Sequence, residues 1–282
     1  MERINFNEHF MHANAREYVD HNINTDHIYV LREELNSIIP LHTHKQGHVS
    51  IVMDGVATIH TEKNSHYIPN GYFCWVPPEV PHHVSFEVEK IRTLNIYFPA
   101  IPADNEFYSR VAVYPILPIL SNTVELIKNQ NAEYSPEDWQ FKLLSTLREI
   151  FPHIIQQIDF KLVLPITDNP IVNNIIRVIH QQFDKNITLE SVGSEIGMSE
   201  RSISRYMRKD LKISFYQYLR LFRILQSIKM MASTEESLGN IAFKVGYDSL
   251  SAFSSAFYAV TGVRPSQFET NRFYAKQLNC PE

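Results

Sequence analysis

The C-terminal half of the chain contains the stretch "ESVGSEIGMSERSISRYM" (residues 190–207), and "GNIAFKVGYDSLSAFSSAF" (residues 239–257) repeats its pattern. The matched positions are Gly193 with Ala242, Gly197 with Gly246, Ile203 with Phe253, and Met207 with Phe257. The first two pairs lie 49 positions apart and the last two 50, so the second copy has one extra residue in its turn.

Each copy has the pattern of a helix-turn-helix motif. A small residue such as Gly193 lets two helices cross closely, and Gly197 can adopt the left-handed conformation that ends the first helix. We expect Ser199 in the first copy and Asp248 in the second to begin the second helix. The apolar pairs four positions apart would then hold that helix against a core.

Cations occupy one face of the second helix in the first copy. Arg201, Ser204, Arg205 and Arg208 lie at positions i, i+3, i+4 and i+7. Arginine binds guanine O6 and N7 at two points or pairs with phosphate. The alternative is a solvated basic face on an ordinary bundle, and the repeat favours DNA recognition. We predict that this first recognition helix (199–209) supplies most of the base readout.

The second copy differs on the equivalent face. Its matching residues are Ser251, Ser254, Ser255 and Tyr258, so no cation is expected there. The hydroxyl groups could contact phosphates or bases, or the helix could dock with little readout.

Charge is divided unevenly along the chain. Residues 1–167 hold 12 Lys and Arg against 20 Asp and Glu, a net charge of −8. Residues 168–282 hold 14 against 11, a net charge of +3. The split indicates two separate roles, with an anionic partner for the positive half. A charge of only +3 predicts a modest salt dependence of DNA binding.

Composition indicates a soluble globular protein. Apolar residues make up 44% of the chain and charged residues 20%, which is typical of that class. Cys74 and Cys280 lie far apart, so we expect no disulfide framework. The N-terminus lacks the apolar segment of a signal peptide, and the longest apolar run, Val111–Leu120, is too short to span a bilayer. We therefore expect a cytoplasmic protein without a membrane partner.

The fold class that these patterns predict is α+β with two domains. Short β-branched and aromatic runs separated by turns fill residues 28–98, which is typical of a sandwich or small barrel. From Asn169 and Pro170 onward the pattern is helical. We predict three segments: 1–105 as the β-barrel, 106–167 as a helical segment and linker, and 168–275 as the helical unit.

With these residues in view, the run Thr188–Phe268 resembles the AraC/XylS family of bacterial transcription regulators. The resemblance rests on "GMSERSISRYMR", "YLRLFRILQSIKMMA", "IAFKVGYDSLSAF" and "TGVRPSQF". It implies a seven-helix DNA-binding unit whose two motifs read adjacent major-groove segments. By position it places base contacts at Arg201, Ser204 and Arg205 in the first motif, and at Leu250, Ser251 and Ser255 in the second. The family often has Arg where this chain has Ser255, which weakens the expected contribution of the second motif.

The N-terminal half resembles the single-cupin sensor of that family. The cupin pattern is HxH, three residues, Glu, six residues and Gly. Here His42 and His44 are followed by His48 and then Gly55, so His48 stands in place of the glutamate. His82 ends a second motif that begins at Gly71 and runs through Pro77. Four imidazoles at His42, His44, His48 and His82 would suit Zn, Ni, Co, Cu or Fe(II), each oriented by an outer partner.

Two other interpretations of the histidines stay open. In the first, they line a pocket for a small organic effector, beside Tyr72, Phe73 and Trp75, because such pockets are mostly apolar with a few polar groups. In the second, one or two of them lie on the outer face of a strand. Cys74, between aromatic residues, fits a core position better than a ligand position.

The predicted function is a DNA-binding transcription regulator with an effector-sensing cupin domain. Its expected partners are double-stranded DNA, a small effector, RNA polymerase and a second copy of the chain. The segments Val124–Ile127 and Trp139–Phe151 could form the dimer interface or pack within the chain. The competing class is a cupin metalloenzyme fused to a DNA-binding module. His48 at the expected carboxylate position weakens that alternative, so we expect no enzymatic activity.

Overall fold

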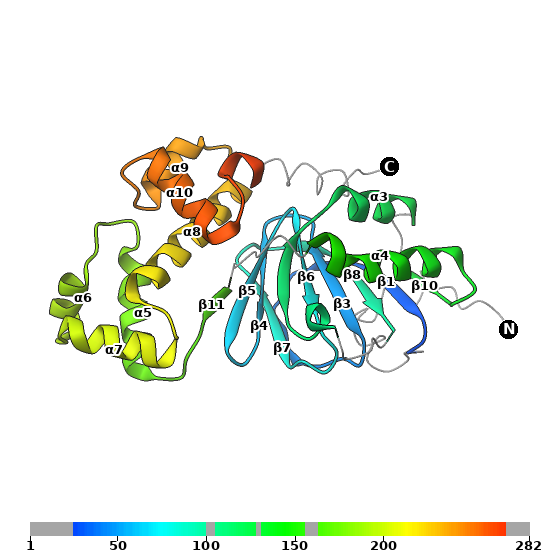
Figure 1. Cartoon of the computed structure of the whole chain (residues 1–282), viewed down its shortest axis with the longest axis horizontal. Helices are drawn as coiled ribbons and strands as arrows, with labels where there is room; N and C mark the ends of the chain where they lie inside the picture. Colours follow the sequence, from blue (N-terminus) through cyan, green and yellow to red (C-terminus); the bar gives the residue numbers. More distant parts are fainter. Residues whose placement is uncertain (1–24, 100–104, 128–130, 156–162, 269–282) are drawn as a thin grey trace. The chain divides into compact units, whose positions relative to one another are not determined.

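The computed structural model describes residues 25–99, 105–127, 131–155 and 163–268. The chain separates into two compact units (Figure 1). Of the described residues, the first unit holds 25–59 and 68–155, and the second holds 60–67 and 163–268. None of the helices in these ranges is both long and apolar enough to cross a lipid bilayer.

The N-terminal half forms two β-sheets, as the short alternating runs predict. The strands are β1 (Ile28–Leu35), β2 (Ile39–His42), β3 (Gly47–Val52), β4 (Val56–His60), β5 (Asn64–Pro69), β6 (Tyr72–Val76), β7 (His82–Phe86), β8 (Ile91–Phe98), β9 (Ala112–Pro115), β10 (Ala132–Tyr134) and β11 (Val163–Pro165). One sheet has the order β10-β1-β8-β3-β6-β9 and the other β11-β5-β4-β7-β2. Neighbouring strands of the first sheet run antiparallel.

The two faces of the six-stranded sheet differ because successive side chains of a strand point to opposite sides. One face carries apolar side chains that pack against α3 (Pro118–Leu126) and α4 (Trp139–Ile155), which lie along the sheet in Figure 1. The rings of Phe73 and Phe151 stack there with centroids 5.3 Å apart. The opposite face is buried but polar, with His48 and Asn95 among its side chains.

The segment 106–167 is only partly helical, which corrects the expectation of a helical segment. Besides α3, α4 and the short helix η1 (Glu106–Tyr108), it contains β9, β10 and β11. Strands β9 and β10 form the two edges of the six-stranded sheet. Such short runs show no decisive period, so only their hydrogen-bonding partners make them strands.

The C-terminal half is helical, as predicted. Its helices are α5 (Pro170–Gln182), α6 (Leu189–Ile196), α7 (Glu200–Asp210), α8 (Phe215–Ser233), α9 (Leu238–Lys244) and α10 (Leu250–Thr261), and residues 265–268 are also helical. Side-chain caps begin α5 and α6: the side chain of Asn169 accepts from Ile171 N, with Pro170 at the first helical position of α5. Thr188 and Ser191 form a capping box at the start of α6.

Candidate functional site

The turn between α6 and α7 has the predicted helix-turn-helix geometry. Gly197 ends α6 with φ of 69°, and the side chain of Ser199 accepts from Ser202 N at 3.2 Å to begin α7. A Cβ at Gly193 would lie 2.4 Å from the carbonyl oxygen of Met198. Any larger residue at Gly193 would therefore force the turn away from α6, which confirms why this position is small.

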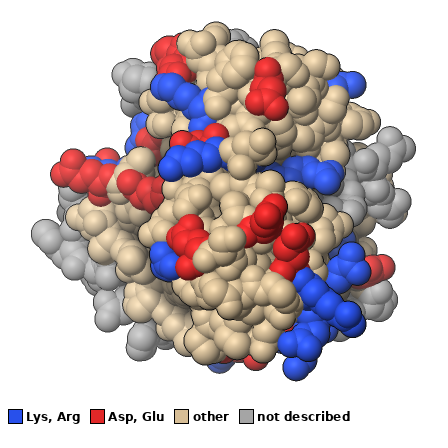
Figure 2. Space-filling view, turned by 90° about the vertical axis from the view of Figure 1, so that its left-hand side faces the viewer, with Lys and Arg blue, Asp and Glu red and all other residues tan. Residues whose placement is uncertain are grey.

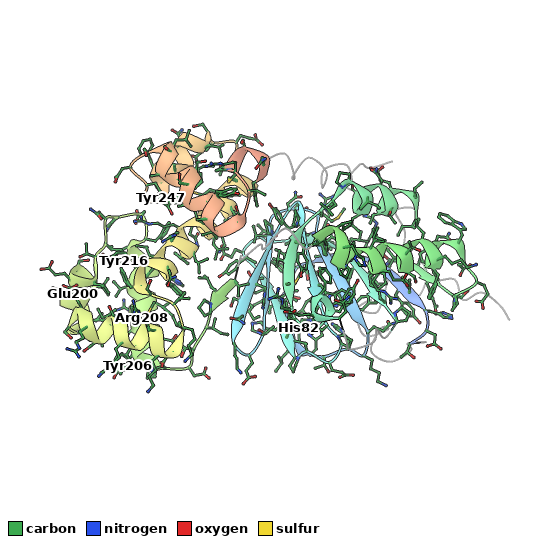
Figure 3. The ribbon with its side chains drawn as sticks, in the orientation of Figure 1. His82, Glu200, Tyr206, Arg208, Tyr216 and Tyr247 are labelled. Carbon is green, nitrogen blue, oxygen red and sulfur yellow. The ribbon has the colours of Figure 1, made fainter. Side chains whose placement is uncertain are left out.

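Helix α7 separates a buried face from a basic face. Ile203 and Met207 are fully buried, whereas Arg201, Arg205 and Arg208 are exposed. Ser204 is half-buried between them. The Arg205 guanidinium carbon lies 5.3 Å from the ring centre of Tyr206, and Figure 3 labels Tyr206 and Arg208 on this helix. The structure thus brings all four residues of the predicted readout face to one helix surface.

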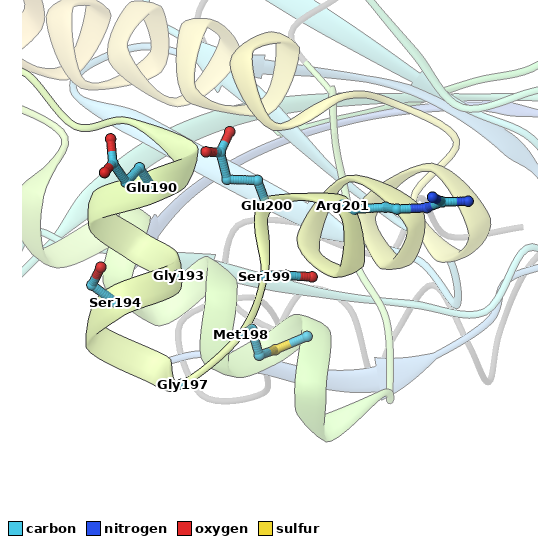
Figure 4. A pocket seen from close by; sticks show the side chains of 8 residues that line it. All are labelled: Glu190, Gly193, Ser194, Gly197, Met198, Ser199, Glu200 and Arg201. Atoms are coloured by element: carbon cyan, nitrogen blue, oxygen red, sulfur yellow. The ribbon is translucent and has the colours of Figure 1, made fainter.

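An open depression lies at the start of α7 (Figure 4). It is lined by Glu190, Gly193, Ser194, Gly197, Met198, Ser199, Glu200 and Arg201. The carboxylates of Glu190 and Glu200 point to the same side of the turn, while Arg201 extends away from them. Two carboxylates repel a phosphate, so this depression does not favour an anion.

The second motif begins its recognition helix one residue later than expected. The side chain of Ser249, not Asp248, accepts from Ala252 N at 3.2 Å and caps α10. The extra turn residue that the repeat shows accounts for this shift. Gly246 has φ of 87°, as its match to Gly197 predicts.

The exposed face of α10 carries a cation that counting along the helix missed. Leu250 is 47% exposed, and Ser251 and Ser255 are exposed as well. Beyond the end of the helix, Arg264 places its guanidinium carbon 5.0 Å from the ring centre of Tyr258 and donates to Ser254 Oγ at 3.3 Å. The expectation of a face without cations is therefore wrong, because the charge comes from the turn after α10.

On the face shown in Figure 2, the basic side chains of the described residues do not form one continuous patch. Figure 2 shows Lys and Arg in small groups on one face of the molecule, with Asp and Glu between them. A surface of mixed charge attracts DNA only weakly at long range.

Three histidines cluster in the N-terminal half. His42 on β2 pairs in register with His82 on β7, and His44 follows in the next turn. The ring centroids are 4.1 Å apart for His42 and His82, 5.1 Å for His44 and His82, and 5.9 Å for His42 and His44. One nitrogen of each ring lies within 4.8 Å of one nitrogen of each other ring. His44 and His82 are buried and His42 is half-buried; Figure 3 labels His82.

In each of the three rings, Nδ1 is hydrogen-bonded to a backbone carbonyl oxygen. His42 Nδ1 lies 2.9 Å from the carbonyl oxygen of Pro40, and His82 Nδ1 lies 2.8 Å from that of Val80. His44 Nδ1 lies 2.5 Å from the carbonyl oxygen of Gln46. A carbonyl oxygen only accepts hydrogen bonds, so each Nδ1 carries the proton and each Nε2 carries the lone pair.

The fourth predicted histidine, His48, lies beside this cluster but outside the set of three. It belongs to β3 of the six-stranded sheet, whereas His42 and His82 belong to the other sheet. Its ring centroid is 4.6 Å from that of His44 and 4.7 Å from that of Tyr97, on which it stacks. The expectation of four converging imidazoles is thus reduced to three.

The buried polar face next to the histidines includes residues that sequence reasoning did not single out. In register, Tyr97 and Asn95 of β8 oppose His48 and Ser50 of β3, so these four share one face. Asn95 Nδ2 donates to Glu33 Oε2 at 3.0 Å. The sequence could have indicated this surface, because polar residues alternate with apolar ones along both β3 and β8.

Two of the three predicted aromatic residues lie on the other face, whereas Tyr72, which alternates with Phe73 on β6, lies on the face of His48. Phe73 and Trp75 belong to the apolar cluster against α3 and α4, and Trp75 opposes Val49 rather than His48. Their placement beside the histidines is therefore wrong, because β6 alternates. Cys74 is fully buried, and burial raises the pKa of its thiol, in agreement with a core position.

Comparisons with known proteins identify both halves. A family model described as an AraC-like ligand binding domain matches residues 27–114, and one described as a helix-turn-helix domain matches residues 192–271. The HTH-type transcriptional regulator NimR of Escherichia coli is 23% identical over 241 residues, which are 86% of this chain and 85% of that protein. Another relative, the uncharacterized regulator YtdP of Bacillus subtilis, is 26% identical over 36% of this chain and 13% of its own length.

Two solved structures also match. The C-terminal domain of AraT from Geobacillus stearothermophilus is 35% identical, covering 36% of this chain and 85% of that one, with a TM-score of 0.35. ToxT from Vibrio cholerae is 15% identical, covering 86% of this chain and 98% of that one, with a TM-score of 0.36.

Proposed function

The chain is a transcription regulator of the AraC family, and we propose that it reads DNA chiefly through α7 under the control of a small effector bound in its N-terminal domain. The observation that carries this proposal is the face of α7. Arg201, Arg205 and Arg208 are exposed there, above Ile203 and Met207 that fix the helix in its core. A helix with three exposed guanidinium groups on one face fits the major groove, where arginine reads guanine.

The side chains of this face have two proposed roles. Arg205, at the centre of the face, contacts a base edge together with Arg201 and Ser204. Arg208, one turn further along, pairs with phosphate. In the second motif, Leu250, Ser251 and Ser255 lie against the adjacent groove segment and add less discrimination, since neutral side chains make weaker contacts than bidentate arginine.

Arg264 is a further phosphate ligand in this proposal. Its guanidinium is exposed, and its contacts with Tyr258 and Ser254 orient it beside the α10 face. A phosphate contact adds affinity without sequence preference and contributes about one unit to the salt slope.

The effector site in this proposal is the buried polar surface around His42, His44, His48 and His82. Effector binding changes DNA affinity only through different affinities for two arrangements of the protein. A homodimer, with RNA polymerase as its partner in the cytoplasm, completes the proposal. Val124 and Phe151 are buried against the sheet, so a dimer would use exposed neighbours such as Leu126 and Trp139.

A metalloenzyme fits the structure less well. The oxygen-activating two-histidine set needs a carboxylate. Among the described residues, the group of potential metal ligands contains three histidines and no carboxylate.

Arg205→Ala tests the proposed readout. Full-length protein and a fluorescent operator, selected from random duplexes, are compared by anisotropy at one fixed salt concentration. Arg205→Ala should lose about 1–3 kcal/mol of specific binding and relax the preference at one base pair. The matched variant Ser255→Ala should lose much less. Equal losses, or no loss for Arg205→Ala, would contradict the assignment of readout to α7.

A further inference from the structure

We propose that His42, His44 and His82 bind one divalent transition-metal ion through their Nε2 atoms. An ion at these histidines would lie in the proposed effector site. Only its role in regulation rests on the proposed function. Whether the ion binds can be measured without DNA.

The first support is the shared orientation of the three rings. Each Nδ1 donates to a backbone carbonyl oxygen two positions away, at Pro40, Gln46 and Val80. Metal-binding histidines are typically held in this way, with the outer nitrogen bonded to a carbonyl or carboxylate and the other nitrogen facing the ion. The backbone therefore sets all three rings in the tautomer that a metal requires.

The second support is the spacing of the nitrogens. Zinc binds histidine at 2.0–2.1 Å, so three tetrahedral ligands lie roughly 3.3 Å from one another. In this structure one nitrogen of each ring lies within 4.8 Å of one nitrogen of each other ring. Metal binding would therefore bring these nitrogens closer by about 1.5 Å at most.

The ligand set selects the class of ion. Three imidazoles without a carboxylate suit Zn, Ni, Co, Cu or Fe(II), and they exclude Mg and Ca, which require oxygen ligands. Three protein ligands also leave at least one coordination position open. His48 and Tyr97 stack beside His44, so a donor atom of a bound effector would meet these two side chains next to the ion.

Two of the three rings are buried: His44 and His82 are 6% and 1% exposed. An ion bound there loses water molecules, and the imidazole nitrogens would replace them as ligands, which offsets the cost of burying its charge. The half-buried His42 leaves an entry side for the ion.

Cobalt titration of untagged, chelator-treated full-length protein tests the site, because tetrahedral Co²⁺ has visible ligand-field bands that Zn²⁺ abolishes. Wild type should bind one Co²⁺ per chain, displaced by one Zn²⁺. His42→Gln and His82→Gln should lose about 100-fold in affinity or more. The matched control His83→Gln, on the next residue of β7 and the opposite face of the strand, should bind as wild type does. Far-UV circular dichroism verifies that each variant is folded. If His82→Gln unfolds, the test rests on His42→Gln, whose position is only half-buried.

Absence of Co²⁺ bands and of Zn²⁺ binding in the wild type would overturn the inference, as would unchanged binding in folded His42→Gln. Arg205→Ala separates this failure from that of the proposed function. That variant should bind Co²⁺ normally and lose operator affinity. If Arg205→Ala loses operator affinity as expected but neither it nor the wild type binds metal, only the metal site is refuted. If Arg205→Ala binds metal normally and keeps its operator affinity, only the readout by α7 is refuted.

Discussion

Gly193→Ala should disturb the first helix-turn-helix more than its size suggests. The added methyl carbon would lie 2.4 Å from the carbonyl oxygen of Met198. Relaxed contacts between carbon and oxygen are about 3.3–3.6 Å long, so α6 and the turn must separate by roughly 1 Å. The hydrogen bond from Met198 N to Gly193 O, 2.9 Å long, joins the same two segments and would be strained.

The magnitude follows from three contributions. Overpacking costs about 1–3 kcal/mol and the strained hydrogen bond about 1 kcal/mol. The higher helix propensity of alanine relative to glycine stabilises α6 by about 1 kcal/mol. The net loss of stability is therefore about 1–3 kcal/mol. A shift of roughly 1 Å also moves Arg205 out of the hydrogen-bonding range of 2.7–3.2 Å, so operator affinity should fall about as far as in Arg205→Ala.

Gly197→Ala is the matched control on the same turn. Its φ is 69° and no atom lies within 4 Å of an added Cβ, so the only cost is the left-handed backbone, about 1–2 kcal/mol. Urea unfolding followed by far-UV circular dichroism should show both variants destabilised, and anisotropy should show operator affinity lost only in Gly193→Ala. Unchanged affinity in Gly193→Ala, or an equal loss in both variants, would refute the reasoning.

Two further predictions concern protonation and capping. Burial, with a smaller contribution from the charge of His60, lowers the pKa of His66 to about 4. A folded-state pKa below the reference value of about 6.5 gives stability that is present above pH 6.5 and is lost, by about 3 kcal/mol, as the pH falls toward 4. In urea titrations across this pH range, the free energy of unfolding of His66→Gln should fall less toward low pH than that of the wild type. The same pH dependence in both proteins would contradict the lowered pKa. Ser249→Ala should destabilise the C-terminal helices by about 0.5–2 kcal/mol while Asp248→Ala changes stability little, since only Ser249 caps α10; a reversed order in thermal melts would disprove the observed cap.

Local physical chemistry explains what the repeat predicted correctly. Gly193 permits a close helix crossing, Gly197 adopts a left-handed backbone and Ser199 caps a helix, and each role depends on residues only a few positions away. The buried pair Ile203 and Met207 and the exposed arginines follow from the helical period alone. For these reasons both helix-turn-helix motifs, their core and the readout face of α7 could be predicted without coordinates.

Contacts between distant segments decided the rest. His42 and His82 meet only because β2 and β7 pair in register, and His48 reaches the side of His44 from a strand of the other sheet. The side of the sheet that Trp75 occupies depends on the pairing of β6 with β3, and a shift of one residue would exchange its two faces. Arg264 reaches the α10 face from a turn outside the helix. Strand register and approaches from outside an element are non-local, so no periodicity along the chain encodes them, and only the folded structure shows which polar residues share a site.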